Sequence, residues 1–330
     1  MDTDQPDVPP RADHEDNGYQ HPMLAKARSL SGLEDHLKER IIGQDLALKQ
    51  IAKAVHRGEL GLRDKPGQVK GVYLFLGSTG VGKTETTLCL ARYLYGETEE
   101  RMHRFDMAEH QTESSLGLLL GRNRDEQGIL GDAIDRLNAR GGGFLLFDEI
   151  EKASKPLVQV FLGIMDAARV SMSTGEVKHL ENIYLVFTSN LGTAESMMME
   201  NMPYSGLKRH VLHVAQEFFG PPIMGRFQEK IVFRRLTHDV QIAICEQMLK
   251  KEFPYFANVA GCRIEADRSV FPFILKRGYD RLLGARPMKE AIDREVGNAI
   301  TEWAMSHSGQ HPVALRLRGE TDKIVAEAVV

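Results

Sequence analysis

Gly77-Ser78-Thr79-Gly80-Val81-Gly82-Lys83-Thr84 has the pattern G-x-x-x-x-G-K-T, which is typical of a phosphate-binding loop. The preceding residues Val72–Leu76 are all apolar and predict a buried strand, and the following residues Thr86–Leu94 predict a helix. Glycines let the loop backbone turn its N–H groups toward a phosphate, and the helix N-terminus adds partial positive charge. We therefore expect a nucleotide site in which Lys83 reaches the β- and γ-phosphates of ATP and Thr84 places its hydroxyl on Mg²⁺.

The composition limits the class of protein. The 330 residues are enough for about two domains of ordinary size, and 42% of them are hydrophobic. A net charge of only −4 gives no overall basic field, so nucleic acid is not indicated as a partner. Three widely separated cysteines form no C-x-x-C pair, which favours a reducing, cytoplasmic location without disulfides or zinc. No window approaches ~18 apolar residues, so we expect no membrane insertion.

The first segment, residues 1–22, is acidic and proline-bearing and has almost no large apolar side chains. Such a segment cannot bury enough surface to become ordered, so we expect a disordered acidic tail. It also lacks the basic start and apolar core of a secretion signal. We interpret it as a solvated leader, with recruitment of a partner as the alternative.

Further apolar runs predict more strands, and helical stretches such as Pro156–Ala168 separate them. The candidate strands are Met102–Phe105, Phe144–Phe147, Ile183–Thr188 and Ile231–Phe233. Strands that alternate with helices predict an α/β fold, here a five-stranded parallel sheet with helices on both faces. At the N-terminal side, Ser31–Glu34 has the pattern of a helix capping box.

The pattern changes after about Leu236. Apolar residues at helical spacing predict one helix around Val240–Met248 and a longer one over Met288–Trp303. Short alternating runs at 312–317 and 323–330 predict strands of a small sheet. We therefore expect a large nucleotide-binding domain over 23–236 and a small α+β domain over 237–330.

Acidic and amide side chains follow two of the predicted strands. Asp148 and Glu149 come directly after Phe144–Phe147, which is the Walker B pattern. Asp148 is expected to hold Mg²⁺ through its water shell, and Glu149 to act as the general base on the attacking water. Asn190 closes the strand at 183–188, where its amide could orient that water or sense the γ-phosphate.

The order and spacing of these motifs resemble the AAA+ ATPases, and in particular the second ATPase module of the Clp-type chaperone unfoldases. The likeness runs from about Leu30 to the C-terminus. The matching segments are Ile42-Gly43-Gln44, Gly77–Glu85, Phe147–Ala153, Thr188–Gly192, Phe219–Phe227, Gly278–Asp280 and Gly284–Pro287.

The resemblance implies an ATPase with further site residues. Arg226 would be the arginine finger, which reaches the nucleotide of a neighbouring subunit and stabilises charge on the transferring phosphoryl group. Arg286 would be sensor 2, which brings the small lid domain onto the γ-phosphate, and Ile41 and Ile42 would pack near the adenine. A finger that acts in trans implies a homo-oligomeric ring, hexameric in most relatives, that acts on a protein substrate or partner complex.

The chain departs from the family in the pore loop, within Leu119–Leu130. The family carries an aromatic Gly-Tyr-Val-Gly there, which grips polypeptide. Here the loop is shorter, has no aromatic residue, and contains Arg122 and Arg124. A tyrosine offers stacking and apolar contact to any passing chain, whereas arginines pair with carboxylates or phosphates, or remain solvated. Threading of unfolded chains is therefore in doubt.

Other departures concern the finger segment, which reads Pro221-Pro222-Ile223 where the family commonly has Pro-Glu-Phe, and the number of modules. We expect a stand-alone single ATPase module with no preceding substrate-binding domain. The methionines Met197–Met199 and Met202 are interpreted as helix residues packed into the core, or alternatively as an adaptable apolar surface.

We accordingly expect a ring-forming, ATP-hydrolysing remodeller of proteins or protein complexes. One alternative is an ATP-dependent oligomerising switch or scaffold that recruits a partner. A less favoured alternative is a nucleic-acid-stimulated motor with Arg122 and Arg124 lining its pore.

Overall fold

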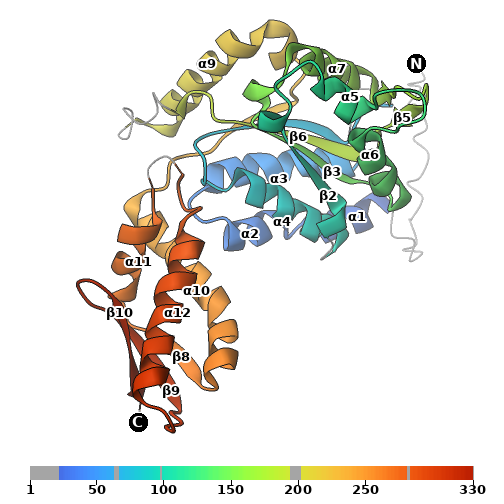
Figure 1. Ribbon diagram of the computed structural model, residues 1–330. Helices are drawn as coiled ribbons and strands as arrows, with labels where there is room; N and C mark the ends of the chain where they lie inside the picture. The colour runs from blue at the N-terminus through green and yellow to red at the C-terminus, as the bar shows by residue number, and fades with distance from the viewer. Residues whose placement is uncertain (1–21, 63–66, 97–98, 194–201, 281–282, 330) are drawn as a thin grey trace, which may run out of the picture.

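The structure is a computed structural model that describes residues 22–62, 67–96, 99–193, 202–280 and 283–329 (Figure 1). The predicted acidic tail, apart from Pro22, and the methionines Met197–Met199 lie outside the described residues. No helix in the described ranges is both long enough and apolar enough to cross a bilayer.

A five-stranded sheet forms the centre of the larger part of the molecule, with strand order β2-β3-β6-β1-β7 and parallel pairing throughout. The strands are β1 Gly71–Leu76, β2 Met102–Asp106, β3 Gly143–Asp148, β6 Ile183–Ser189 and β7 Glu229–Val232. Every residue of β1, β3 and β6 is buried, which explains why these segments are continuous apolar runs. The five predicted strands are confirmed, although β7 begins two residues before its expected start at Ile231.

Helices cover both faces of this sheet, as predicted (Figure 1). One core contains side chains of α2 Leu33–Arg40, α3 Asp45–Glu59 and α4 Lys83–Tyr95. The opposite core contains side chains of α6 Ile129–Ala139, α7 Lys155–Ala167 and α9 Tyr204–Met224. Because the strands are parallel, the loops that follow β1, β3 and β6 meet at one edge of the sheet, where a ligand site is expected.

The C-terminal part forms a separate lobe in Figure 1. Its helices are α10 His238–Ala260, α11 Val270–Gly278 and α12 Met288–Ser306, and its strands are β8 Arg263–Ala266, β9 Ala314–Gly319 and β10 Ile324–Val329. In its sheet, β9 pairs antiparallel with β10 and parallel with β8. The predicted small α+β fold is confirmed; the limits 23–236 and 237–330 remain our proposal for the two domains.

Three local features differ from the sequence-based expectations. The capping box at Ser31–Glu34 was wrong, because α2 begins at Leu33 with Gly32 as a cap that makes no side-chain bond. The hydroxyl of Ser31 instead donates to the carbonyl of Arg28, at 2.8 Å, where the unforeseen helix α1 Pro22–Leu30 ends. The remaining α-helices and strands that were not predicted individually are α5 Ser115–Leu120, α6, α9, α11, β8, and the hairpin of β4 Arg169–Ser171 and β5 Val177–His179.

Candidate active site

The loop Gly77–Thr84 joins the buried strand β1 to helix α4, as the sequence predicts. Gly82 caps the helix in the left-handed region, with φ 106°, a conformation that side-chain-bearing residues rarely adopt. The first helical residue is Lys83, so its side chain and the free N–H groups of the first turn lie at the same end of the helix. The loop thus carries the positive end of a helix dipole.

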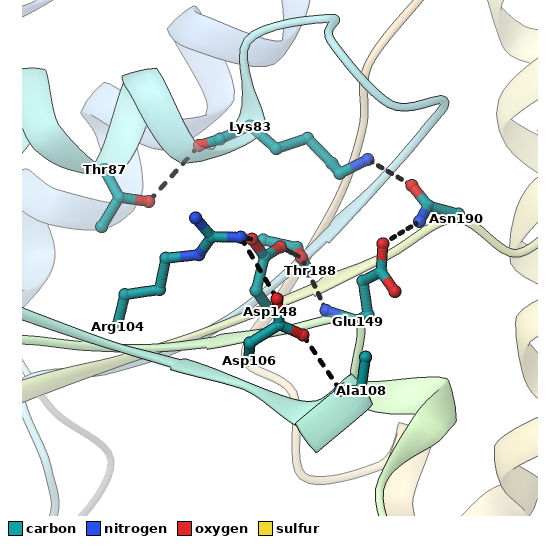
Figure 2. A network of polar contacts seen from close by, with 9 residues as sticks. All are labelled: Lys83, Thr87, Arg104, Asp106, Ala108, Asp148, Glu149, Thr188 and Asn190. Carbon is teal, nitrogen blue, oxygen red and sulfur yellow. Dashed lines mark hydrogen bonds and ion pairs between the residues drawn. The ribbon is translucent and has the colours of Figure 1, made fainter. Parts of the chain in front are cut away.

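The side chain of Lys83 is buried inside this loop, with 8% of the residue exposed. Its Nζ donates to the carbonyl of Gly77, to the carbonyl of Ser78 at 2.9 Å and to Oδ1 of Asn190 at 2.9 Å (Figure 2). Burial lowers the pKa of Lys83 to about 8, against the opposing charges of Asp148, Glu151 and Glu149. The ammonium is therefore bound by neutral acceptors that a phosphate could replace.

At the end of β3, one hydroxyl from the neighbouring strand β6 contacts both the carboxylate of Asp148 and the backbone of Glu149. Thr188 donates to the carboxylate of Asp148 and accepts the backbone N–H of Glu149, at 3.1 Å. Glu149 has a left-handed backbone, with φ 57°, which is uncommon for a residue other than glycine. This turn sends the side chain of Glu149 toward Asn190 rather than along the strand (Figure 2).

Asn190 connects the phosphate loop to the predicted general base. Its Oδ1 accepts from Lys83, and its Nδ2 donates to Oε1 of Glu149 at 3.3 Å. Its own backbone N–H donates to Oε1 of Glu151, at 3.0 Å. Three residues predicted from separate segments, Lys83, Glu149 and Asn190, are thus in direct contact.

Arg104 is a residue of this site that the sequence analysis missed. Its Nη2 lies 2.6 Å from Oδ2 of Asp148 and 3.7 Å from Oδ2 of Asp106, and Figure 2 shows the guanidinium beside both carboxylates. The register of the sheet, which the structure supplies, explains the contact: Asp106 ends β2 directly opposite Asp148, and Arg104 lies on the same face of β2 two residues earlier.

The segment before the first core helix is tied to the loop by Gln44, a second residue whose role was not foreseen. Its buried amide donates to the carbonyls of Val81, at 3.2 Å, and Arg234, at 2.9 Å. It also accepts the backbone N–H of Arg234 at 2.9 Å.

Ile41, expected to pack near the adenine, is 5% exposed and lies against Gly82. A Cβ added to Gly82 would be 3.1 Å from Cγ2 of Ile41. Ile42 is half-buried beside it.

The two arginines assigned by resemblance do not contact Lys83, Asp148 or Glu149 through any bond between described residues. Arg226 binds Asp166. Arg286 is exposed, but its segment touches the phosphate loop. The backbone of Gly284 and that of Gly80 approach so closely that a Cβ on Gly80 would lie 2.2 Å from the carbonyl oxygen of Leu283.

The residues present fit Mg²⁺ and ATP. Asp148 already has a cationic group, that of Arg104, within 2.6 Å of one carboxylate oxygen, so the position favours a cation. Thr84 lies in the first turn of α4 and offers a hydroxyl oxygen, which together with a carboxylate suits Mg²⁺. The buried ammonium and the helix N-terminus suit the phosphates.

Two family models match the chain. A model described as AAA domain (Cdc48 subfamily) matches residues 68–230, and one described as the C-terminal, D2-small domain of ClpB protein matches residues 236–311. The chain belongs to the Clp-type AAA+ family. The resemblance of the motifs to the second Clp module is thereby confirmed, together with the fold of a large AAA+ domain and a small lid domain.

Several curated proteins are similar over most of this Clp-type chain. Chaperone protein ClpB of Meiothermus ruber is 35% identical over 286 residues, which cover 84% of this chain and 33% of that protein. Chaperone protein ClpB of Agrobacterium fabrum is 32% identical, over 92% of this chain and 35% of that protein. Chaperone protein ClpB2, chloroplastic, of Oryza sativa subsp. japonica is 34% identical, over 82% of this chain and 28% of that protein. The chain spans about a third of the length of these relatives.

Proposed function

We propose that the chain hydrolyses ATP and uses the reaction to remodel proteins or protein complexes. The observation that carries this proposal is the chain of bonds from Lys83 through Asn190 to Glu149. It links the group that binds phosphate to the group that takes a proton from water. The similarity to ClpB chaperones supports protein as the class of substrate.

The chemistry follows from the position of these groups. The loop N–H groups and Lys83 hold the phosphates, as the ammonium exchanges carbonyl partners for phosphate oxygens. Glu149 accepts a proton from the attacking water as its oxygen bonds to the γ-phosphorus and the bond to ADP breaks. The Asn190 amide keeps that carboxylate oriented. Mg²⁺, held by Thr84 and Asp148, would neutralise charge on the phosphate oxygens.

We further propose that the active form is a homo-oligomeric ring, hexameric by analogy with the family. In it, Arg226 acts on the nucleotide of an adjacent copy, and Arg286 carries the movement of the lid domain to the γ-phosphate. Ile41 and Ile42 would then pack against the adenine, and a cytoplasmic location would supply the ATP. The contact between Gly80 and Gly284 supports communication between the phosphate loop and the lid segment.

The short loop between α5 and α6 supports action on a folded partner rather than threading. Its base is closed by the backbones of Gly121 and Gly128, since a Cβ on Gly128 would lie 2.3 Å from the nitrogen of Gly121. Arg122 and Arg124 are exposed, and the adjacent exposed Asp125 and Glu126 balance their charge. A balanced, non-aromatic loop suits neither a general polypeptide grip nor a nucleic-acid channel.

The test is steady-state ATP hydrolysis by the purified chain alone, with unfolded casein, and with single-stranded DNA. Basal hydrolysis that casein leaves unchanged, together with capture of an assembled partner by Glu149→Gln, is the expected result. Strong stimulation by casein would instead identify a threading unfoldase. Stimulation by DNA that weakens steeply with salt would identify a nucleic-acid motor. ATP-dependent assembly without turnover would identify a switch or scaffold.

A further inference from the structure

The guanidinium of Arg226 is fully engaged along one edge by a single carboxylate. Its Nε lies 2.8 and 2.9 Å from the two oxygens of Asp166, and its Nη2 lies 2.7 Å from Oδ2. Its Nη1 donates to the carbonyl of Pro222, at 2.6 Å. The contact joins the end of α7, which carries Asp166, to the residues just after α9.

The contacts with Asp166 and Pro222 use only some of the N–H donors of Arg226. A guanidinium has five N–H donors in a fixed plane. Asp166 takes those of the edge formed by Nε and Nη2, and Pro222 takes one of Nη1. The outer edge of the guanidinium, formed by Nη1 and Nη2, keeps one N–H on each nitrogen outside these contacts, and such N–H groups can donate to phosphate oxygens.

We propose that Asp166 is a positioning residue for Arg226, which fixes the guanidinium so that its outer edge is presented to the nucleotide of an adjacent copy of the chain. This inference rests on the proposed function. Among the described residues Arg226 is bonded to Asp166 and Pro222, and to none of Lys83, Asp148 and Glu149. An arginine held in place loses less freedom when it binds, and the attacked phosphate meets an already oriented donor.

The residues next to Asp166 and Arg226 in the sequence are buried in the apolar core. Met165 and Phe227, the sequence neighbours of Asp166 and Arg226, are 7% and 1% exposed and belong to the same apolar core. Phe227 packs at 5.5 Å from Phe187, a residue of the central strand β6. The backbones on both sides of the ion pair are therefore fixed by the core, while the pair itself lies at the surface.

Stability does not explain the pair. The side chains of Arg226 and Asp166 are 34% and 53% exposed, and pairs in such positions add little to the free energy of folding. Removal of the Asp166 carboxylate should therefore leave the folded chain intact. What it should change is the orientation of the guanidinium, and a misplacement of about 1 Å can cost roughly 10²-fold in rate.

The first experiment compares Asp166→Ala with the wild type in ATP binding and steady-state hydrolysis. We expect kcat to fall roughly 10²-fold while the Kd for ATP and the urea midpoint stay unchanged. Asp166→Glu, which keeps a carboxylate, should recover part of the rate. Glu265→Ala is the matched control, because Glu265 is a surface acid of the lid domain, 43% exposed, that pairs with Arg316. Unchanged kcat in Asp166→Ala would overturn the proposal.

The second experiment mixes Asp166→Ala subunits with Glu149→Gln subunits. Each protein alone should be slow, but an Asp166→Ala site that receives a finger from a Glu149→Gln neighbour is complete. Hydrolysis by the mixture should therefore exceed the sum of the two separate rates. No gain would mean that Asp166 serves its own nucleotide site, which contradicts the proposal.

The rate of Arg226→Ala, measured in parallel, distinguishes the role of Arg226 as a finger from the role of Asp166 in positioning it. A wild-type rate in Arg226→Ala would show that the finger assignment itself is wrong, and the role of Asp166 would fail with it. An inactive Arg226→Ala beside a fully active Asp166→Ala would overturn the positioning role alone.

Discussion

Thr188 illustrates how, at the scale of single residues, the site depends on a side chain that carries no charge. Its hydroxyl is completely buried and serves Asp148 as a donor and the backbone of Glu149 as an acceptor. One oxygen atom thus fixes the carboxylate of Asp148 and the backbone of Glu149, the two residues expected to take part in hydrolysis. A buried polar group that loses its partner carries the full penalty of desolvation.

Thr188→Val should therefore destabilise the fold by about 1–3 kcal/mol and slow hydrolysis, because the N–H of Glu149 loses its acceptor. Urea unfolding measures the first effect. Thr86→Val is the matched control: Thr86 is equally buried, but its hydroxyl donates to the carbonyl of Gly82, which already accepts the N–H of Thr86 at 2.9 Å. Equal losses in the two variants would contradict this account.

The lowered pKa of Lys83 leads us to expect that ATP binding depends on pH. Its pKa of about 8, lowered by burial, means that the unbound protein loses this ammonium as the pH rises through about 8. The Kd for ATP should be level below that pH and increase above it, by at most about tenfold per pH unit. Lys83→Arg stays charged and should lose this dependence. A level wild-type profile from pH 7 to pH 10 would be the contrary result.

The lowered pKa of Lys83 also makes the free energy of unfolding depend on pH. The unfolded lysine keeps its proton to about 10.5, whereas the folded one releases it near 8. Between these values the unfolded chain binds more protons, so the contribution of Lys83 to stability rises with pH across that window.

Much of the site could be predicted because Lys83, Asp148, Glu149 and Asn190 each follow an apolar strand or its loop, and parallel strands bring such ends together. Arg104 could not be found this way, since a lone arginine in a half-exposed strand has no distinctive pattern. Its partner is set by the pairing of β2 with β3. The bonds between Gln44 and Arg234 join residues 190 positions apart and likewise follow only from the fold.

At the scale of elements, the backbones of the phosphate loop and of the turn before α12 approach each other closely. Gly80 and Gly284 both have positive φ, at 71° and 63°. A Cβ on Gly284 would lie 2.5 Å from the carbonyl oxygen of Thr79. The N–H of Ala285 also donates to the carbonyl of Gly80, at 3.4 Å. No side chain fits between these elements without moving them apart.

Gly284→Ala should therefore open this contact, because the added Cβ has no room and the backbone would be strained. Hydrogen exchange at the amides of residues 77–84 and 283–288 should become faster. Gly297→Ala is the control, since Gly297 lies inside α12 and an added Cβ would meet nothing within 4 Å. That change should instead favour the helix, by about 0.5–1 kcal/mol. Unchanged exchange in Gly284→Ala would rule out the predicted separation.

Strands whose residues form continuous apolar runs could be predicted from the sequence. Elements whose position depends on pairing with another segment could not. β1, β3 and β6 are buried at every position, so composition alone identifies them. β8 is only four residues long and mostly half-exposed, and its place depends on pairing with β9. Ser31 had the pattern of a helix cap, but its hydroxyl donates to the carbonyl of Arg28 at the end of α1 instead.

At the scale of the whole molecule, the proposed arginine finger makes activity a property of an assembly. Among the described residues, Arg226 is bound to Asp166 and makes no bond to Lys83, Asn190 or Glu149 of its own chain. A single copy then has the groups for binding ATP and activating water but lacks the charge that a finger adds, which is worth about 10³–10⁵ in rate. Hydrolysis should therefore depend on encounters between copies.

The most direct measurement is the specific rate of ATP hydrolysis by the wild type over a wide range of protein concentrations, beside Glu149→Gln, with ATP binding measured for both. We predict that the wild-type rate per subunit rises with concentration to a plateau, whereas Glu149→Gln binds ATP without turning it over. An absence of wild-type turnover at every concentration, or equal turnover by Glu149→Gln, would contradict the account.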